Sequence, residues 1–336
     1  MTGGISSSHT HHKRVPIQER AFITGDLIGI NGYQANRTLL KQRFLEGGYQ
    51  LQETPHFLLC TRTAVPSTIL VHWLAPEEID ADIGKKFIQE LKPLGLISDA
   101  QQFGQVFAVV LFSLFPHDSQ QALHLYATNT LQRYRSLLRN TSTVCSPSDS
   151  AIHTFSALYR RVFQLLVGER FLDAGCSFGF LPLLIAERFP YLDQVVGIDI
   201  DTDSFPTVRA IAEEQQLKHV HFTQADLLAD DFTSLGVFDT ITALHILEHF
   251  TESDMYRVLT NLLQITSQQL IIAVPYESEE PEIAYGHNQL FSRDKLAEVG
   301  RWCLRHSGGQ VRISYEECAG GLLLIERLSS QVGDHA

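Results

Sequence analysis

The most chemically suggestive stretch of the sequence is a glycine-containing turn at residues 173–179. It has Asp173 at its head, then Gly175, Ser177 and Gly179 at alternate positions, and a helical segment follows it. Glycines let the backbone bend sharply and approach a ligand without a Cβ in the way. The N-terminus of the next helix favours a carboxylate or a phosphate. The turn therefore predicts a ligand with an anionic end, although tight packing alone would also explain it.

Two acidic residues follow the next two predicted strands, QVVGIDI and HVHFTQAD. Asp199 comes about 20 residues after the turn, where an acidic side chain can accept both hydroxyls of a ribose. Asp226 and its neighbour Leu227 lie where the edge of an adenine is expected. The carboxyl ends of parallel strands meet at one edge of a sheet. The turn and these residues together predict a site for a nucleoside with a negatively charged tail.

A second group of polar residues lies further along the chain. His245, Glu248 and His249 belong to the segment HILEHF, and His287 lies in a loop at 274–292. Histidine side chains titrate near neutrality, so His245, His249 or His287 could act as the base that removes a proton from a hydroxyl. The alternative is that Glu248 and His249 only cap a helix. The spacing is not a recognised set of metal ligands, so no metal is predicted, although His245, His249 and a loop acid could also bind a divalent ion.

These residues must be positioned by the elements that begin at residue 151. From there predicted strands and helices alternate, which is typical of a doubly wound, mostly parallel sheet in an α/β fold. The last two predicted strands, QVRISYEEC and GLLLIERL, are joined by a very short link at Ala319 and Gly320. A link of that length can only make an antiparallel hairpin.

The N-terminal half has a different pattern. Short predicted strands come first, and helical segments follow at 76–95 and 130–140. Periodicity does not decide whether residues 107–115 form a strand or a helix. The Ser- and Thr-rich segment 141–150 resembles a linker and indicates a domain boundary near residue 145. The predicted organisation is a disordered tail at 1–18, a smaller accessory α+β domain at 19–145 and the α/β domain at 151–330.

Composition restricts the class of protein. The chain has 336 residues and a formal net charge of −12, which argues against a general nucleic-acid binder. No apolar run reaches the length of a membrane span, and the N-terminus lacks the apolar stretch of a secretory signal. The five cysteines are scattered without a CxxC pair, which suits the reducing cytoplasm better than a disulfide framework.

The turn and the segments that follow it resemble the class I S-adenosylmethionine-dependent methyltransferases. The stretch DAGCSFG resembles motif I of that family with its middle glycine replaced by Ser177, and FDTITALHILEHF and LIIAVP resemble the fourth and fifth strands. The resemblance covers roughly residues 155–328 and implies a Rossmann-like seven-stranded sheet whose last strand is antiparallel. It also implies S-adenosylmethionine as the cofactor, held by Asp173, Gly175, Ser177, Gly179, Asp199, Asp226, Leu227 and His245. The replacement at Ser177 puts only close contact with the tail of the cofactor in doubt.

A narrower resemblance concerns the acceptor. CSFGFLPLLIAE, the HILEH stretch, the loop from VPYE to AYGH and the closing CAGGLLLIERL are similar to the mycofactocin oligosaccharide methyltransferase family. This resemblance implies O-methylation of a glucose hydroxyl. Among the candidate bases named above, His245 is preferred, and His249 or His287 comes next. The N-terminal domain is expected to complete the acceptor site or to form a homodimer contact. The alternatives are a phenolic or quinone-type acceptor, an NAD-binding oxidoreductase, and a methyltransferase-fold protein that binds without turnover.

Overall fold

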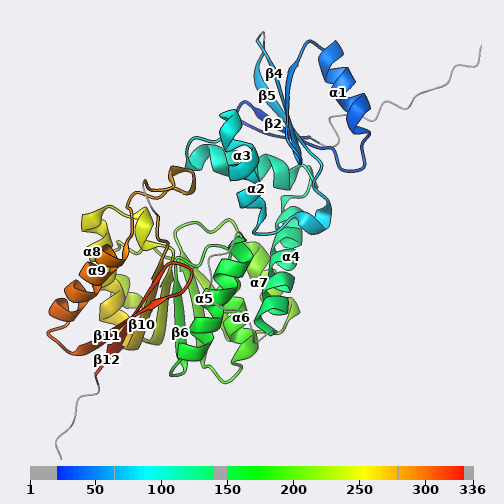
Figure 1. Cartoon of the computed structure of the whole chain (residues 1–336). Coiled ribbons are helices and arrows are strands. Elements are labelled where there is room, and N and C mark those ends of the chain that lie inside the picture. The colour runs from blue at the N-terminus through cyan, green and yellow to red at the C-terminus, as the bar shows by residue number, and fades with distance from the viewer. Residues whose placement is uncertain (1–20, 64, 140–149, 278–279, 329–336) are drawn as a thin grey trace, which may run out of the picture.

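The computed structural model describes residues 21–63, 65–139, 150–277 and 280–328. The predicted tail at 1–18 and the predicted boundary near residue 145 lie outside these residues. The described chain forms two β-sheets with helices packed on them (Figure 1). None of its helices is both long enough and apolar enough to cross a membrane.

The first sheet has five strands in the order β1-β2-β5-β4-β3. Only β2 and β5 pair in parallel, and the other neighbours are antiparallel. Helix α3 packs so closely on β2 that a Cβ at Gly29 would lie 2.3 Å from the carbonyl oxygen of Val109. The elements of this half are β1 (Ala21–Thr24), β2 (Leu27–Asn31), α1 (Arg37–Glu46), β3 (Gln50–Glu53), β4 (Phe57–Arg62), β5 (Val65–His72), α2 (Ile83–Glu90), α3 (Ala100–Phe112) and α4 (Ser119–Arg139).

The helical segments of this half differ in detail from the prediction. Residues 107–115, which periodicity left undecided, lie mostly in helix α3. The helix expected at 130–140 begins earlier, at Ser119. The helix expected at 76–95 is shorter, because Asp80 and Asp82 make contacts with other helices. Both form ion pairs with Arg133 of α4, and Asp82 also accepts a hydrogen bond from the backbone N–H of Ile152. These contacts fix a turn before α2.

The second sheet has seven strands in the order β11-β12-β10-β9-β6-β7-β8. Only β12 runs antiparallel to its neighbours, β10 and β11, so the predicted sheet and its terminal hairpin are confirmed. The strands are β6 (Arg170–Ala174), β7 (Gln194–Asp199), β8 (Val220–Gln224), β9 (Phe238–Leu244), β10 (Thr266–Val274), β11 (Val311–Glu317) and β12 (Gly321–Arg327).

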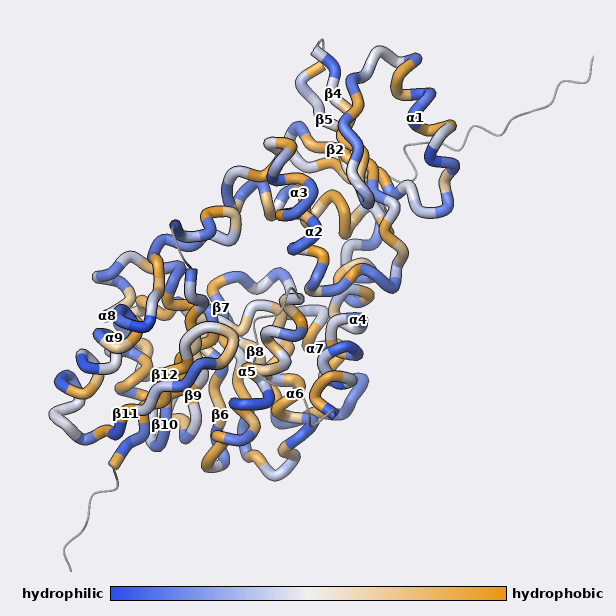
Figure 2. The backbone as a smooth tube through the Cα atoms, in the orientation of Figure 1, coloured by the Kyte–Doolittle hydropathy of each residue, from blue (hydrophilic) through white to orange (hydrophobic). Residues whose placement is uncertain are grey.

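Helices lie on both sides of this sheet (Figure 2), and its central strands β9 and β10 are accordingly buried over most of their length. Successive residues of a strand point to opposite faces: Phe171 belongs to one core and Leu172 to the other. The first core contains α5 (Ala151–Leu165), α6 (Phe180–Arg188) and α7 (Phe205–Glu214), and the second contains α8 (Glu252–Ile265) and α9 (Arg293–His306).

The N-terminal half packs against the α5–α7 side of this sheet. The core that contains α5 to α7 continues into α2, α3, α4 and the five-stranded sheet. Helix α4 lies along α5 and α7, and its Arg135 pairs with Glu187 of α6 through an Nε–Oε2 contact of 3.0 Å. Figure 1 shows α2 and α3 lying beyond one end of the seven-stranded sheet. This arrangement places the N-terminal helices over the end of the sheet where the predicted site residues lie.

Candidate active site

A cavity of about 860 Å³ lies at the carboxyl ends of β6, β7 and β9. Its size is within the range of about 300–1,000 Å³ that is usual for small-molecule sites. Helices α2 to α5 supply one wall, and the 173–179 turn, the end of β9 and the loop after β10 supply the others. The cavity is lined by seven residues predicted from the sequence: Asp173, Gly175, Ser177, Asp199, His245, His249 and His287.

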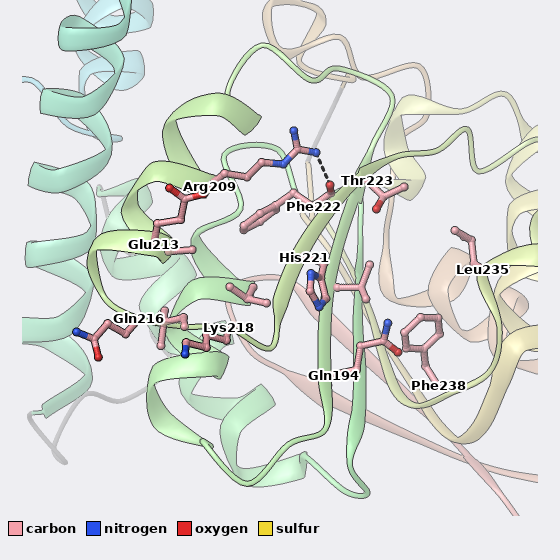
Figure 3. Close-up of a pocket in the computed structure, with 14 residues that line it drawn as sticks. Gln194, Arg209, Glu213, Gln216, Lys218, His221, Phe222, Thr223, Leu235 and Phe238 are labelled. Carbon is pink, nitrogen blue, oxygen red and sulfur yellow. Dashed lines mark hydrogen bonds between the residues drawn. The ribbon is translucent and has the colours of Figure 1, made fainter.

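A second cavity, of about 740 Å³, lies between α7 and the edge strand β8 (Figure 3). None of the predicted site residues lines it. Arg209 lines this second cavity, but its guanidinium already donates a hydrogen bond of 2.6 Å to the carbonyl oxygen of Phe222, which lines the same cavity. The chemistry expected from the sequence therefore belongs to the first cavity.

The 173–179 turn is held tightly against the ends of its neighbouring strands. Gly175 has φ 73°, and its N–H donates to the carbonyl oxygen of Ile198 at 2.9 Å. A Cβ at Gly175 would lie 2.7 Å from the side chain of Ile246, so any other residue would be strained there and would force a shift. Ser177 has φ 48°, and its N–H donates to Asp199 Oδ2 at 2.7 Å. The turn is thus preformed, with Asp199 fixed beside it.

Three predicted residues do not line this cavity. Gly179 begins α6 with φ 67°, and a Cβ there would lie 2.3 Å from the ring of Phe222. Asp226 is exposed, and its Oδ1 accepts from the backbone N of Leu228. Leu227 is buried in the core on the α8 side of the sheet. In this conformation Gly179 shapes the turn, while Asp226 and Leu227 stay predicted contacts of the adenine.

Asp173 is a buried carboxylate at the floor of the cavity. Only 5% of its surface is exposed, and its Oδ1 accepts a hydrogen bond of 2.6 Å from the hydroxyl of Thr242. Burial raises the pKa of Asp173 to about 7, and the charge of Asp199 adds to the rise while the Thr242 hydrogen bond opposes it. A cation bound beside Asp173 would hold it in the ionised form.

His245 is held in a strained backbone conformation at the end of β9. Its φ is 52°, in the left-handed region, and its N–H donates to the carbonyl oxygen of Ala273 at 2.8 Å. The ring packs 5.0 Å from that of Phe155, centroid to centroid. Burial lowers the pKa of His245 to about 4, with smaller contributions from the neighbouring histidines, so the ring is neutral at pH 7. Within the described parts of the chain its Nε2 is buried without a hydrogen-bond partner.

His245, Glu248, His249 and His287 form one group, called here the histidine cluster. Glu248 is completely buried, and neither of its carboxylate oxygens has a hydrogen-bond partner among the described residues. Its Oε1 lies 3.8 Å from His245 Nδ1 and 4.0 Å from His287 Nε2. Burial raises the pKa of Glu248 to about 8, and Glu277 adds to the rise.

The loop after β10 brings His287 to the cluster. The backbone N–H groups of Asn288 and Gln289 donate to the carbonyl oxygen of Glu248 at 2.7 and 3.1 Å. The Asn288 side chain donates to the carbonyl oxygen of His249 at 2.6 Å. No local sequence pattern predicts these contacts, because they join segments about 40 positions apart. They attach the loop firmly to the end of β9.

The sequence from residue 171 to residue 269 matches a family described as a methyltransferase domain. This chain is an S-adenosylmethionine-dependent methyltransferase. The match lies on the segment that carries the turn, Asp199 and His245, so it concerns the same cavity. The predicted enzyme class and cofactor are thereby confirmed.

Other comparisons give only distant similarities to this methyltransferase. No curated protein matches the chain. An O-methyltransferase family protein from Burkholderia thailandensis is 14% identical, with a TM-score of 0.47 over 88% of this chain and 84% of the other. The magnesium protoporphyrin IX methyltransferase of Synechocystis PCC 6803 is 16% identical, with a TM-score of 0.40 over 62% of this chain and 100% of the other.

The residues of the cavity fit S-adenosylmethionine. The turn lines the cavity with Gly175 and Ser177, and the glycine lets Ile246 pack directly against the backbone of the turn. Two carboxylates, Asp173 and Asp199, line the same cavity and match the positive and hydroxyl-bearing parts of the methyltransferase cofactor. Ser177 replaces a glycine and adopts its left-handed conformation, so the turn keeps its shape.

The sequence led us to expect that the N-terminal domain completes the acceptor site or forms a dimer contact, but it did not identify the residues of the wall that the N-terminal helices contribute. Lys85 and Gln89 of α2, Phe103 of α3, and Tyr126 and Tyr134 of α4 line the cavity of the methyltransferase. They belong to no motif, and only their place in the folded chain reveals them. The polar and aromatic character of these side chains bears on the acceptor.

Proposed function

We propose that this methyltransferase transfers a methyl group to a sugar hydroxyl, and that the acceptor is the oligosaccharide of mycofactocin. The observation that carries the sugar acceptor is the composition of the cavity beyond the cofactor turn. Aromatic rings and hydrogen-bonding side chains surround the histidine cluster there, including Phe103, Gln89 and Tyr285. Sugars offer C–H faces to rings and hydroxyls to polar groups. The narrower choice of mycofactocin rests on the sequence resemblance.

Each residue of the 173–179 turn has a proposed role toward the cofactor. Asp173 binds the ammonium group, Asp199 accepts the ribose hydroxyls, and Gly175 and Ser177 bring the backbone close to the methionine end. Asp199 already accepts from Ser177 and Asp201, and each carboxylate oxygen retains a second lone pair for a hydroxyl. When bound, the cofactor supplies an activated methyl group on its sulfonium. Apart from taking up the proton of the acceptor hydroxyl, the protein has only to bind and align the acceptor.

The acceptor hydroxyl must lose its proton, and we assign that proton to His245. Its ring lines the cavity, and its buried Nε2 has no hydrogen-bond partner among the described residues. His249 and His287 are less suited, because one ring nitrogen of each already contacts the protein. Three cysteines, Cys60, Cys176 and Cys303, are buried and free, which agrees with the proposed cytoplasmic location.

The proposed acceptor is tested by turnover. The purified chain is incubated with S-adenosylmethionine and a panel of β-glucosides and cello-oligosaccharides, beside a matched panel of catechols and hydroquinones. The proposal predicts S-adenosylhomocysteine and an O-methylated sugar in the glucoside arm alone. Methylation confined to the phenolic arm, or to neither, would contradict a sugar acceptor.

A further inference from the structure

We propose that Glu248, His249 and His287 bind a divalent transition-metal ion, and that this ion holds two neighbouring hydroxyls of the acceptor. The sequence alone gave no recognised ligand set here, because His287 is far from the other two residues in the chain. The metal site is inferred from contacts of these three side chains that do not depend on which acceptor the enzyme uses. The role of the ion toward the acceptor rests on the proposed function.

The three side chains converge at the distance that an ion requires. One potential ligand atom from each lies within 4.8 Å of the others. Bonds of about 2.0–2.2 Å from a metal to N and O ligands place ligand atoms up to about 4.4 Å apart. Glu248 Oε1 and His287 Nε2, at 4.0 Å, already meet this limit. A small closing movement of the side chains is enough to complete the set.

The hydrogen bonds of the two histidines leave the correct nitrogens for a metal. His249 Nδ1 lies 3.1 Å from the carbonyl oxygen of Gly286, which can only accept, so Nδ1 carries the proton. His287 Nδ1 lies 2.7 Å from the Glu277 carboxylate and carries its proton for the same reason. The lone pair of each ring is therefore on Nε2. Ligating histidines usually donate their other N–H to a carbonyl or carboxylate in this way.

Glu248 gives the independent reason to expect a cation. Its side chain is fully buried, and neither oxygen has a hydrogen-bond partner within the described ranges. A carboxylate buried without partners is costly, and buried charges are normally paired or coordinate a metal. The nearest imidazole nitrogens, at 3.8 and 4.0 Å, are too far for hydrogen bonds. An ion bound between Glu248, His249 and His287 would give the carboxylate the partner that it lacks.

The ligand types indicate which metals fit. Two imidazoles and one carboxylate suit Mn²⁺, Fe²⁺, Co²⁺ or Zn²⁺, whereas Mg²⁺ and Ca²⁺ prefer oxygen ligands. Three protein ligands leave coordination positions open, and the cluster lines the same cavity as the cofactor turn. Two adjacent hydroxyls of a sugar can fill such positions. The ion would then orient one of them and make it more acidic.

The test of the site measures binding of Mn²⁺ alone. The full chain is stripped with a chelator, dialysed and titrated with Mn²⁺, and the free ion is followed by electron paramagnetic resonance. One tight equivalent per chain is expected. Glu248→Gln and His287→Gln should each weaken binding at least tenfold, and Glu277→Gln should weaken it about 10–100-fold as a supporting group. His221→Gln, at an exposed position of β8, is the matched control and should bind as the wild type does.

Two outcomes would overturn the metal site: no Mn²⁺ binding by the folded wild-type chain, or binding that Glu248→Gln and His287→Gln leave unchanged. Circular dichroism of each variant shows whether it is folded, and Glu277→Gln gives an independent reading if a ligand variant is not. Turnover separates this inference from the proposed function. Mn²⁺ binding without glucoside methylation supports the site and contradicts the sugar acceptor. Glucoside methylation that persists at full rate after chelation supports the sugar acceptor and contradicts the role of the ion.

Discussion

The two ends of the cavity differ in how completely their polar atoms are satisfied. At the 173–179 turn, Asp173 accepts from Thr242 and Asp199 accepts from Ser177, so the protein itself fixes the geometry. In the histidine cluster, both oxygens of Glu248 and Nε2 of His245 are buried without partners among the described residues. The end at the 173–179 turn, called here the finished end, has its hydrogen bonds in place before a ligand binds. The end at the histidine cluster, called here the open end, is completed only when something binds there.

The largest effect is expected at the open end. His245→Ala should slow methyl transfer about 10²–10⁴-fold, because the acceptor proton loses its base. Although the sequence resemblance also places His245 near the cofactor, the contacts of Asp173 and Asp199 do not depend on this ring, so the affinity for the cofactor should change little. Single-turnover rates and calorimetry with S-adenosylhomocysteine measure the two quantities. A rate near that of the wild type would make His245 a structural residue.

At the finished end, a change of packing should lower stability instead. Gly179→Ala adds a Cβ at φ 67° that would lie 2.3 Å from the ring of Phe222. Strain and overpacking should together lower the free energy of unfolding by about 2–4 kcal/mol. Urea denaturation measures the loss, and Gly104→Ala, at a helical glycine with open space around it, is the matched control. Equal stability of the two variants would show that the turn is not tightly built.

Asp199→Ala tests whether the finished end binds the cofactor. Loss of charged hydrogen bonds to the ribose should weaken binding of S-adenosylhomocysteine by about 1.5–3 kcal/mol, or roughly 10–150-fold. Asp226→Ala is the informative companion, because Asp226 lies outside the cavity lining. Calorimetry on both variants compares them directly. Unchanged affinity in Asp199→Ala would remove the ribose assignment.

The pH dependence of cofactor binding should report Asp173. Its pKa is raised to about 7 in the free protein, chiefly by burial and further by Asp199. Buried Tyr159 and Cys176 also face it, and both stay protonated because burial raises their pKa values. The cofactor ammonium favours the ionised carboxylate. Affinity should therefore rise up to about tenfold per pH unit below pH 7 and level off above it.

The variant Asp173→Asn is the control for this pH dependence, and its affinity should be nearly flat between pH 5.5 and 7. The raised pKa of Asp173 also affects the free energy of unfolding of the free protein, and this effect has the opposite pH dependence to the cofactor affinity. Because folding raises the pKa of Asp173, the free protein gains stability from this proton at low pH and loses it as the pH rises from about 4 to about 7. A cofactor affinity that falls as the pH rises would contradict the proposed partner of Asp173.

The smallest effect is expected for Glu248→Gln in the metal-free protein. The carboxylate has no hydrogen-bond partner in the described part of the chain, so the free energy of unfolding should change by less than about 1 kcal/mol. Thermal unfolding with a chelator present measures it, and added Mn²⁺ should stabilise the wild type but not the variant. A large loss of stability without metal would mean that Glu248 already has a structural partner.

The sequence predicted the finished end better than the open end for a physical reason. The 173–179 turn, Asp199 and the terminal hairpin are set by local chemistry: glycine at positive φ, an acid at a strand end, and a link too short for a crossover. His287 reaches Glu248 only through hydrogen bonds from Asn288 and Gln289, which no local pattern encodes. The wall from α2 to α4 depends in the same way on packing between the two halves of the chain.

The position of Asp226 shows the same limit. A place at a strand end predicts that a residue lies near the ligand edge of the sheet, but not which way its side chain turns. In the structure the Asp226 carboxylate accepts from its own backbone neighbour, Leu228. Turn chemistry of this kind is decided by a few atoms after the strand has ended.

The central claim is that the cavity at the carboxyl ends of β6, β7 and β9 binds the methyltransferase cofactor. Its most direct test is calorimetric titration of the folded, full-length chain with S-adenosylhomocysteine. The account predicts one site per chain, with binding strongly weakened by Gly175→Val, because a Cβ at φ 73° would lie 2.7 Å from Ile246 and displace the turn. No heat of binding from the folded wild-type chain, or equal binding by the folded Gly175→Val variant, would contradict it.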